Sequence, residues 1–136
     1  MFRRGRILVI DDDPTSRLKL EAAARALGHE AAAAPGGRAG LDALARDGAD
    51  LVLLDLLMPD CDGFEALRAS RGDPDLAGVP VLVVSGTEEV VDVARAIELG
   101  AEDVLPKSFD PVQLRARVEA APERRRLRLV EADRVA

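Results

Sequence analysis

Apolar residues recur along the chain in short, unbroken runs. These runs are Ile7–Ile10, Leu51–Leu54, Val81–Val84 and the shorter pair Val104-Leu105. Runs of this length, rich in valine and isoleucine and apolar on both sides, are typical of strands buried in a parallel sheet. A fifth segment, 30–34, is alanine-rich and would favour a helix by composition. Because it lies between Gly28 and the breaking sequence Pro35-Gly36-Gly37, we predict a strand there too.

Segments with helical spacing lie between these runs. Pro14 follows Asp13 and Pro111 follows Asp110, and an N-cap residue before a first-turn proline marks a helix start. The expected helices cover about 14–27, 38–46, 64–70 and 88–99, and the last begins at Pro111 and is interrupted at Pro122. Strand and helix therefore alternate five times, which predicts an α/β fold with a doubly wound, five-stranded parallel sheet and five helices.

Length and composition narrow the class of protein. A chain of 136 residues suits one domain, and aromatic residues make up only 2%, so the core must be aliphatic. No apolar run approaches the roughly 18 residues needed to cross a bilayer, so no membrane association is expected. The single cysteine, Cys61, excludes an internal disulfide and fits a reducing cytoplasm.

The charge distribution bears on partners and on the ends of the chain. The net charge of −6 argues against a nucleic-acid-binding face, so no direct contact with nucleic acid is expected. Arginines nevertheless cluster at 3, 4 and 6 and at 124, 125, 126 and 128, and we interpret them as solvated terminal charge. We place the domain at 1–121 and a charged tail or connector at 122–136. The only histidine, His29, is expected to be solvated in a turn.

Polar residues gather where the predicted strands end. In an open α/β sheet, sites form outside the carboxyl ends of the strands. Those ends carry Asp11, Asp12, Asp13, Asp55, Ser85 and Lys107. Two carboxylates about 4 Å apart repel by roughly 4 kcal/mol at an effective dielectric near 20, so the acids need a cation, a proton or Lys107. Oxygen-only ligands favour a hard ion, Mg²⁺ (or Mn²⁺) before Ca²⁺. Lys107 and Ser85 suit a phosphoryl group, and an aspartate beside the metal can be the nucleophile.

Four stretches in this order, ILVIDDDP, LVLLDLLMPDCDG, VLVVSG and EDVLPKSF, resemble the receiver domain of two-component response regulators. The likeness runs from about Ile7 to Glu119 and implies the flavodoxin-like, receiver-type fold. It implies that Asp55 is the phospho-acceptor, and that Asp11, Asp12, Asp55 and the backbone carbonyl of Leu57 hold Mg²⁺. Ser85 matches the switch hydroxyl of the family and Lys107 its lysine, while Asp13 is better explained as a helix cap.

The resemblance also implies partners and a mode of action. A sensor histidine kinase or a histidine phosphotransfer protein would donate the phosphoryl group, and the surface near the fourth helix, fifth strand and fifth helix would change. A C-terminal effector domain, a partner protein or a phosphorylation-linked homodimer would give the output. The protein would not be a turnover enzyme, since it assists only its own phosphorylation and dephosphorylation.

Three departures from the family pattern carry expectations. Ser108 follows Lys107 where the family commonly has proline, so we expect a trans peptide bond or a re-routed loop there. Val104 matches the position that often holds a switch aromatic, which weakens the usual coupling. Leu57 cannot orient a water by hydrogen bonding, so we expect slow self-dephosphorylation.

Three rival functions are a phosphohydrolase, an unphosphorylated scaffold and a dinucleotide-binding protein. An aspartyl-nucleophile phosphohydrolase would want a second acid two residues after Asp55, where Leu57 stands. A receiver-like scaffold that is never phosphorylated would not need the acid set. A dinucleotide-binding fold would want a glycine-rich turn after the first strand, which this sequence lacks.

Overall fold

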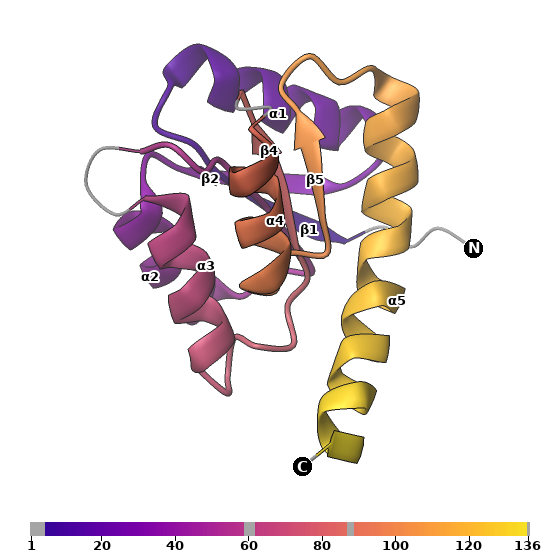
Figure 1. Ribbon diagram of the computed structural model, residues 1–136. Helices are drawn as coiled ribbons and strands as arrows, with labels where there is room; N and C mark the ends of the chain where they lie inside the picture. The colour runs from indigo at the N-terminus through magenta and orange to yellow at the C-terminus, as the bar shows by residue number, and fades with distance from the viewer. Residues whose placement is uncertain (1–4, 59–61, 87–88, 136) are drawn as a thin grey trace.

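The computed structural model describes residues 5–58, 62–86 and 89–135, with side chains as far as Glu131. Within this part of the chain, strands and helices alternate from the first element to the last (Figure 1). They are β1 Arg6–Ile10, α1 Pro14–Ala26, β2 Glu30–Ala34, α2 Gly37–Asp47, β3 Leu51–Leu54, α3 Gly63–Gly72, β4 Val81–Ser85, α4 Val90–Glu98, β5 Asp103–Pro106 and α5 Pro111–Val135.

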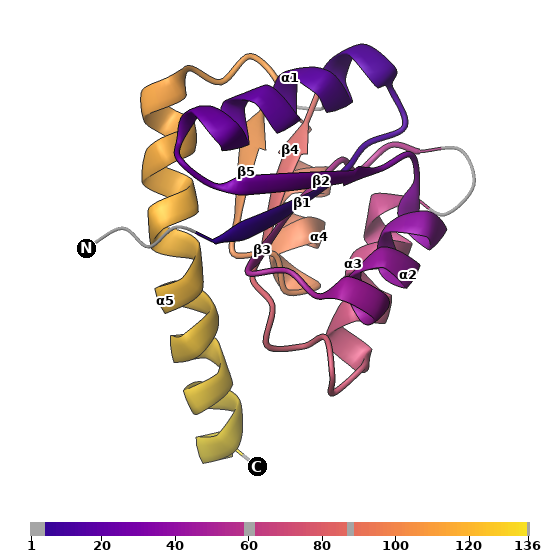
Figure 2. The same cartoon turned by 180° about the vertical axis from the view of Figure 1, so that it is seen from behind.

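The strands form one parallel sheet in the order β2-β1-β3-β4-β5. Helices α1 and α5 cover one face and α2, α3 and α4 cover the other, as Figures 1 and 2 show from opposite sides. Alternate residues of each strand enter the two cores. In β1, Ile7 and Val9 pack in the core with α1 and α5, while Leu8 and Ile10 pack in the core with α2, α3 and α4. The unbroken apolar runs follow from this arrangement, because both faces are covered.

The two expected helix caps, Asp13 and Asp110, are confirmed. The Asp13 carboxylate accepts the backbone N–H of Thr15 at 3.2 Å and caps α1. The Asp110 carboxylate accepts the N–H of Gln113 at 2.8 Å at the start of α5. The alanine-rich segment is β2, an edge strand paired only with β1 in the described sheet. Pairing with β1 therefore outweighs the helix propensity of its alanines.

Three expectations were wrong. The terminal arginines are not all solvated, because Arg125 is only 9% exposed and pairs with Glu102. The other two concern Pro122 and His29. Helix α5 continues through Pro122, although an interior proline costs about 3 kcal/mol; arginine contacts beyond the proline hold the second half of the helix. His29 is only 8% exposed. Its Nδ1 accepts the backbone N–H of Gly5 at 2.9 Å, because the residue before β2 lies beside the residue before β1.

No helix in the described residues combines the length and the apolar character that crossing a bilayer requires.

Candidate functional site

Three carboxylates meet at the carboxyl ends of β1 and β3. One oxygen from each of Asp11, Asp12 and Asp55 lies within 4.8 Å of those of the other two. The sheet produces this meeting, because Ile10 and Leu54 are neighbours in register and the acids follow them directly. The N–H of Asp55 donates to the carbonyl of Ile10 at 2.9 Å, which extends the pairing into the site. Asp11 and Asp55 are buried, at 0% and 3% exposed.

Lys107 bridges two of these acids from the end of β5. Its Nζ lies 3.3 Å from Asp11 Oδ2 and 3.4 Å from Asp55 Oδ2. Its backbone N–H donates to the carbonyl of Ser85 at 3.0 Å, so β4 fixes the start of the loop. The described backbone has no cis peptide bond, and the Lys107–Ser108 bond is trans as expected. The ammonium group therefore lies between the two buried carboxylates.

Asp11 is also held by residues that the sequence analysis did not single out. The Ser16 hydroxyl donates to Asp11 Oδ2 at 2.5 Å, and the N–H of Asp13 donates to Oδ1 at 3.0 Å. Arg17 Nη1 donates to the carbonyl of Asp11 at 3.0 Å. Ser16 and Arg17 lie at the start of α1, shortly after the acids in the sequence. This position is the feature of the sequence that could have identified them as partners of Asp11.

The charges in the site shift two pKa values. Burial, reinforced by the negative charge of Asp11, raises the pKa of Asp55 from 3.8 to about 6, although Lys107 opposes the rise. Burial also acts to lower the pKa of Lys107, but the charges of Asp55 and Asp11 outweigh it and raise that pKa overall. At neutral pH the site therefore holds ionised Asp55 at an energetic cost, beside a lysine that stays protonated.

Ser85 ends the strand that pairs with β3, and Leu57 lies in the loop after β3, two residues beyond Asp55. Ser85 is the last residue of β4 and is 1% exposed. The backbone N–H of Leu57 hydrogen-bonds to the Asp55 carboxylate and lowers its pKa, while the Leu57 side chain is 60% exposed. Pro59 and Cys61 of the same loop lie outside the described residues.

Gly63 follows this loop as the first residue of α3 and lies against the backbone of Asp55. A Cβ at this position would lie 2.3 Å from the carbonyl oxygen of Asp55. The Gly63 N–H donates to the carbonyl of Leu56 at 2.7 Å. Only glycine lets α3 begin so close to the backbone of Asp55.

The donor set fits a hard divalent cation. The acids offer only oxygen ligands. Among the described side chains, Lys107 is the only cationic group that forms ion pairs with Asp11 and Asp55. A few carboxylates with room for water and a phosphate are what Mg²⁺ requires. The three acids can therefore hold a metal ion, and Lys107 partly balances the charge of Asp11 and Asp55.

Comparisons with known proteins agree with this geometry. The sequence model of the response regulator receiver domain matches residues 7–119. The DNA-binding response regulator MtrA of Mycolicibacterium smegmatis is 39% identical over 117 residues, which cover 86% of this chain and 50% of that protein. The chain thus spans about half the length of the curated relatives it matches.

Solved structures give the same result. The signal receiver domain of a signal transduction histidine kinase from Syntrophus aciditrophicus is 31% identical, with a TM-score of 0.79 over 88% of this chain and 90% of that one. NtrX from Brucella abortus is 27% identical, with a TM-score of 0.83 over 96% of this chain and 29% of that one. The chain belongs to the response regulator receiver domain family of two-component signalling systems.

Proposed function

We propose that Asp55 is the phospho-acceptor of this receiver domain. The observation that carries the proposal is the position of Lys107 Nζ, 3.4 Å from an Asp55 oxygen and 3.3 Å from an Asp11 oxygen. An ionised Asp55 oxygen attacks the phosphorus of a phosphohistidine or an acyl phosphate. The new O–P bond forms as the bond to the leaving group breaks, and the leaving group keeps the electron pair.

Asp11, Asp12, Asp55 and the carbonyl of Leu57 are the residues that would hold Mg²⁺ or Mn²⁺. When bound, the ion would supply positive charge that offsets the negative charge of the phosphoryl group. Lys107 contributes a second positive charge, and the Ser85 hydroxyl donates a hydrogen bond to the phosphoryl group once it is attached. Ser16 and Asp13 keep the Asp11 carboxylate oriented through their hydrogen bonds.

A histidine kinase or a histidine phosphotransfer protein is the proposed donor. Phosphorylation replaces a carboxylate of charge −1 by a phosphoryl group that carries about 1.5 to 2 negative charges, in a site that is already acidic. The movement of Ser85 and Lys107 would change the surface of α4, β5 and α5. Apolar side chains exposed there, Val90, Val91 and Val112, suit an effector or a second copy of the chain.

Output through nucleic acid is compatible with the relatives of this chain. The expectation of no direct nucleic-acid contact rested on the acidic charge of this chain, whereas relatives such as MtrA are named DNA-binding response regulators. We propose that any DNA contact would come from a region equivalent to the part of those relatives that this chain does not cover.

Phosphate-affinity electrophoresis and intact-mass measurement with acetyl phosphate and Mg²⁺ test the assignment. The wild type should gain one phosphoryl group and Asp55→Ala none. Asp13→Asn, which removes a carboxylate that caps α1 outside the metal-binding group, should still be phosphorylated. Phosphorylation of Asp55→Ala equal to that of the wild type would rule out Asp55 as the acceptor. Continuous release of p-nitrophenol from p-nitrophenyl phosphate would instead indicate a phosphohydrolase.

A further inference from the structure

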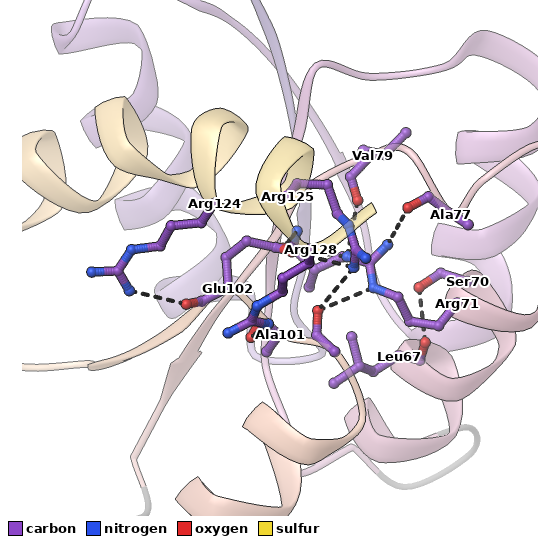
Figure 3. Close-up of polar contacts among 12 residues, drawn as sticks. Leu67, Ser70, Arg71, Ala77, Val79, Ala101, Glu102, Arg124, Arg125 and Arg128 are labelled. Carbon is purple, nitrogen blue, oxygen red and sulfur yellow. Dashed lines mark hydrogen bonds and ion pairs between the residues drawn. The ribbon is translucent and has the colours of Figure 1, made fainter. Parts of the chain in front are cut away.

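Arginine side chains hold the α5 extension, residues 122–135, against the domain (Figure 3). One stripe of α5 faces the domain, at spacings of four and three residues, and its members are Leu114, Val118, Ala121, Arg125 and Arg128. The first three belong to the core shared with α1. Arg125, only 9% exposed, and the half-buried Arg128 continue the stripe. The side of the helix that contacts the domain therefore changes from aliphatic to arginine near Pro122.

The arginines converge on a buried carboxylate. Glu102 is 1% exposed, and its Oε2 accepts the N–H of Val81 at 2.6 Å. Arg71 Nη2, from the end of α3, lies 3.3 Å from the same oxygen, and Arg125 Nη1 lies 3.3 Å from Oε1. We refer to Arg71, Glu102 and Arg125 as the Glu102 cluster.

Backbone carbonyls complete the contacts of the extension. Arg124 Nη1 donates to the carbonyl of Glu102 at 3.1 Å, and Arg128 Nη1 donates to that of Ala101 at 2.6 Å. Arg71 Nε and Arg125 Nη1 donate to the carbonyl of Gly100, at 3.1 and 3.4 Å. The extension thus contacts the chain just before β5, at the edge of the sheet opposite Asp55.

Three elements join the Glu102 cluster to the phosphorylation site. Helix α3, strand β4 and strand β5 each have one end in the site and the other in the cluster. Gly63, Ser85 and Lys107 lie at or next to the ends near the site. At or next to the other ends lie Arg71, Glu102 and Val81, whose N–H donates to Glu102. These elements therefore connect the two edges of the sheet through the backbone.

The cluster is not fully satisfied. Among the described residues, Glu102 Oε1 has its ion pair with Arg125 but no hydrogen bond, and the buried Arg125 Nε has no hydrogen-bond partner. Burial raises the pKa of Glu102 and lowers that of Arg71 to about 10, so both charged forms are costly there. Buried ion pairs add little net stability because desolvation offsets their attraction. Pro122 also removes one backbone hydrogen bond at the base of the extension.

We propose that the Glu102 cluster is a conformational switch that releases the α5 extension when Asp55 is phosphorylated. This inference rests on the proposed function. When Ser85 and Lys107 move toward the phosphoryl group, β4 and β5 shift with them. The N–H of Val81 and the carboxylate of Glu102 then no longer match the guanidinium of Arg125, and the extension separates from the domain.

Hydrogen exchange of the amides in 124–131, measured with and without beryllofluoride and Mg²⁺, tests the switch. Beryllofluoride serves as the phosphoryl mimic, and ¹⁹F NMR reports independently whether it binds at Asp55. In the wild type, the adduct should speed exchange of these amides about fivefold or more, the lower end of typical coupling between sites. In Arg125→Met, exchange should already be fast and the adduct should change it little.

Reciprocity supplies a second measurement. If release and phosphorylation are coupled, Arg125→Met should bind beryllofluoride more tightly by the factor seen in exchange. Arg126→Met is the matched control, since Arg126 pairs only with Glu123 among the described side chains, and it should behave as the wild type. If Arg125→Met does not fold, Arg128→Met removes the contact with Ala101 instead.

The outcomes separate the two proposals. An adduct that forms while exchange in 124–131 stays unchanged or slows would overturn the switch and leave the proposed function standing. A protein whose Asp55 forms no adduct would overturn the proposed function first.

Discussion

Replacing Asp55 by asparagine should make the unphosphorylated protein more stable at neutral pH. The pKa of Asp55 rises from 3.8 to about 6 because the carboxylate is buried near Asp11. At about 1.4 kcal/mol per tenfold change in proton affinity, ionised Asp55 costs the folded state about 3 kcal/mol. Asparagine carries no charge but cannot pair with Lys107, so we expect a gain of about 2 kcal/mol, or about 8 °C in Tm.

The direction of the Asp55 pKa shift determines how the stability of the wild type changes with pH. Because the folded protein holds the Asp55 proton more tightly than the unfolded chain, the wild type gains stability as the pH falls through about 6 toward 3.8. The advantage of Asp55→Asn should therefore be largest near pH 7.5 and shrink near pH 5. Mg²⁺ at about 100 times its Kd should stabilise the wild type by about 2.7 kcal/mol, and Asp55→Asn by less.

Urea unfolding followed by far-UV circular dichroism, with a chelator present, is the suitable assay, since the chain has no Trp or Tyr for fluorescence. Asp42→Asn, an exposed acid on α2, is the control and should leave the free energy of unfolding unchanged. An Asp55→Asn protein that is less stable than the wild type at neutral pH, or whose difference from it does not vary with pH, would refute the reasoning.

Three further predictions concern Leu57, Gly63 and Asp13. Leu57→Asn should shorten the lifetime of the phosphorylated protein about tenfold or more, because an amide can orient the attacking water; loss of radiolabel over time measures it, and an unchanged lifetime would count against the argument. Gly63→Ala should destabilise the fold by about 3 kcal/mol, since its Cβ would lie 2.3 Å from a backbone oxygen, whereas Gly72→Ala, with no atom within 4 Å of the new Cβ, should change stability little in the same urea titration. Asp13→Ala should lose about 1 kcal/mol with its helix cap and keep its capacity for phosphorylation; loss of that capacity would mean that Asp13 does more than cap α1.

Most of the sheet could be predicted because its signals are local. Strands covered on both faces appear as unbroken apolar runs, and β3 has the predicted bounds, Leu51–Leu54. The meeting of Asp11, Asp12 and Asp55 also follows from sequence, because a parallel sheet places successive carboxyl ends at one edge. The order of the strands along the chain and the rule that parallel strands end at one edge were sufficient to predict this meeting.

The contacts of α5 could not be predicted in the same way. Arg125 and its neighbours have the composition of a solvated surface. Nothing near them in the sequence indicates that Glu102, which lies well before them in the chain, is buried and contacts Arg125. The expectation of solvated terminal charge was therefore wrong for Arg125 and for the half-buried Arg128. Only continuation of the Leu114–Val118–Ala121 spacing could have indicated that the same face keeps its contact with the domain.

The course of α5 has a practical consequence for protein engineering. A receiver cut after Ala121, the last aliphatic position of the stripe, would lose Arg125 and leave Glu102 with Arg71 as its remaining buried counter-charge among the described residues. Chimaeras that join this receiver to a foreign output module should therefore be fused beyond Glu131. A junction placed at the proline would combine a truncated helix with a buried acid that has lost its ion pair with Arg125, and poor expression of such a fusion would say nothing about signalling.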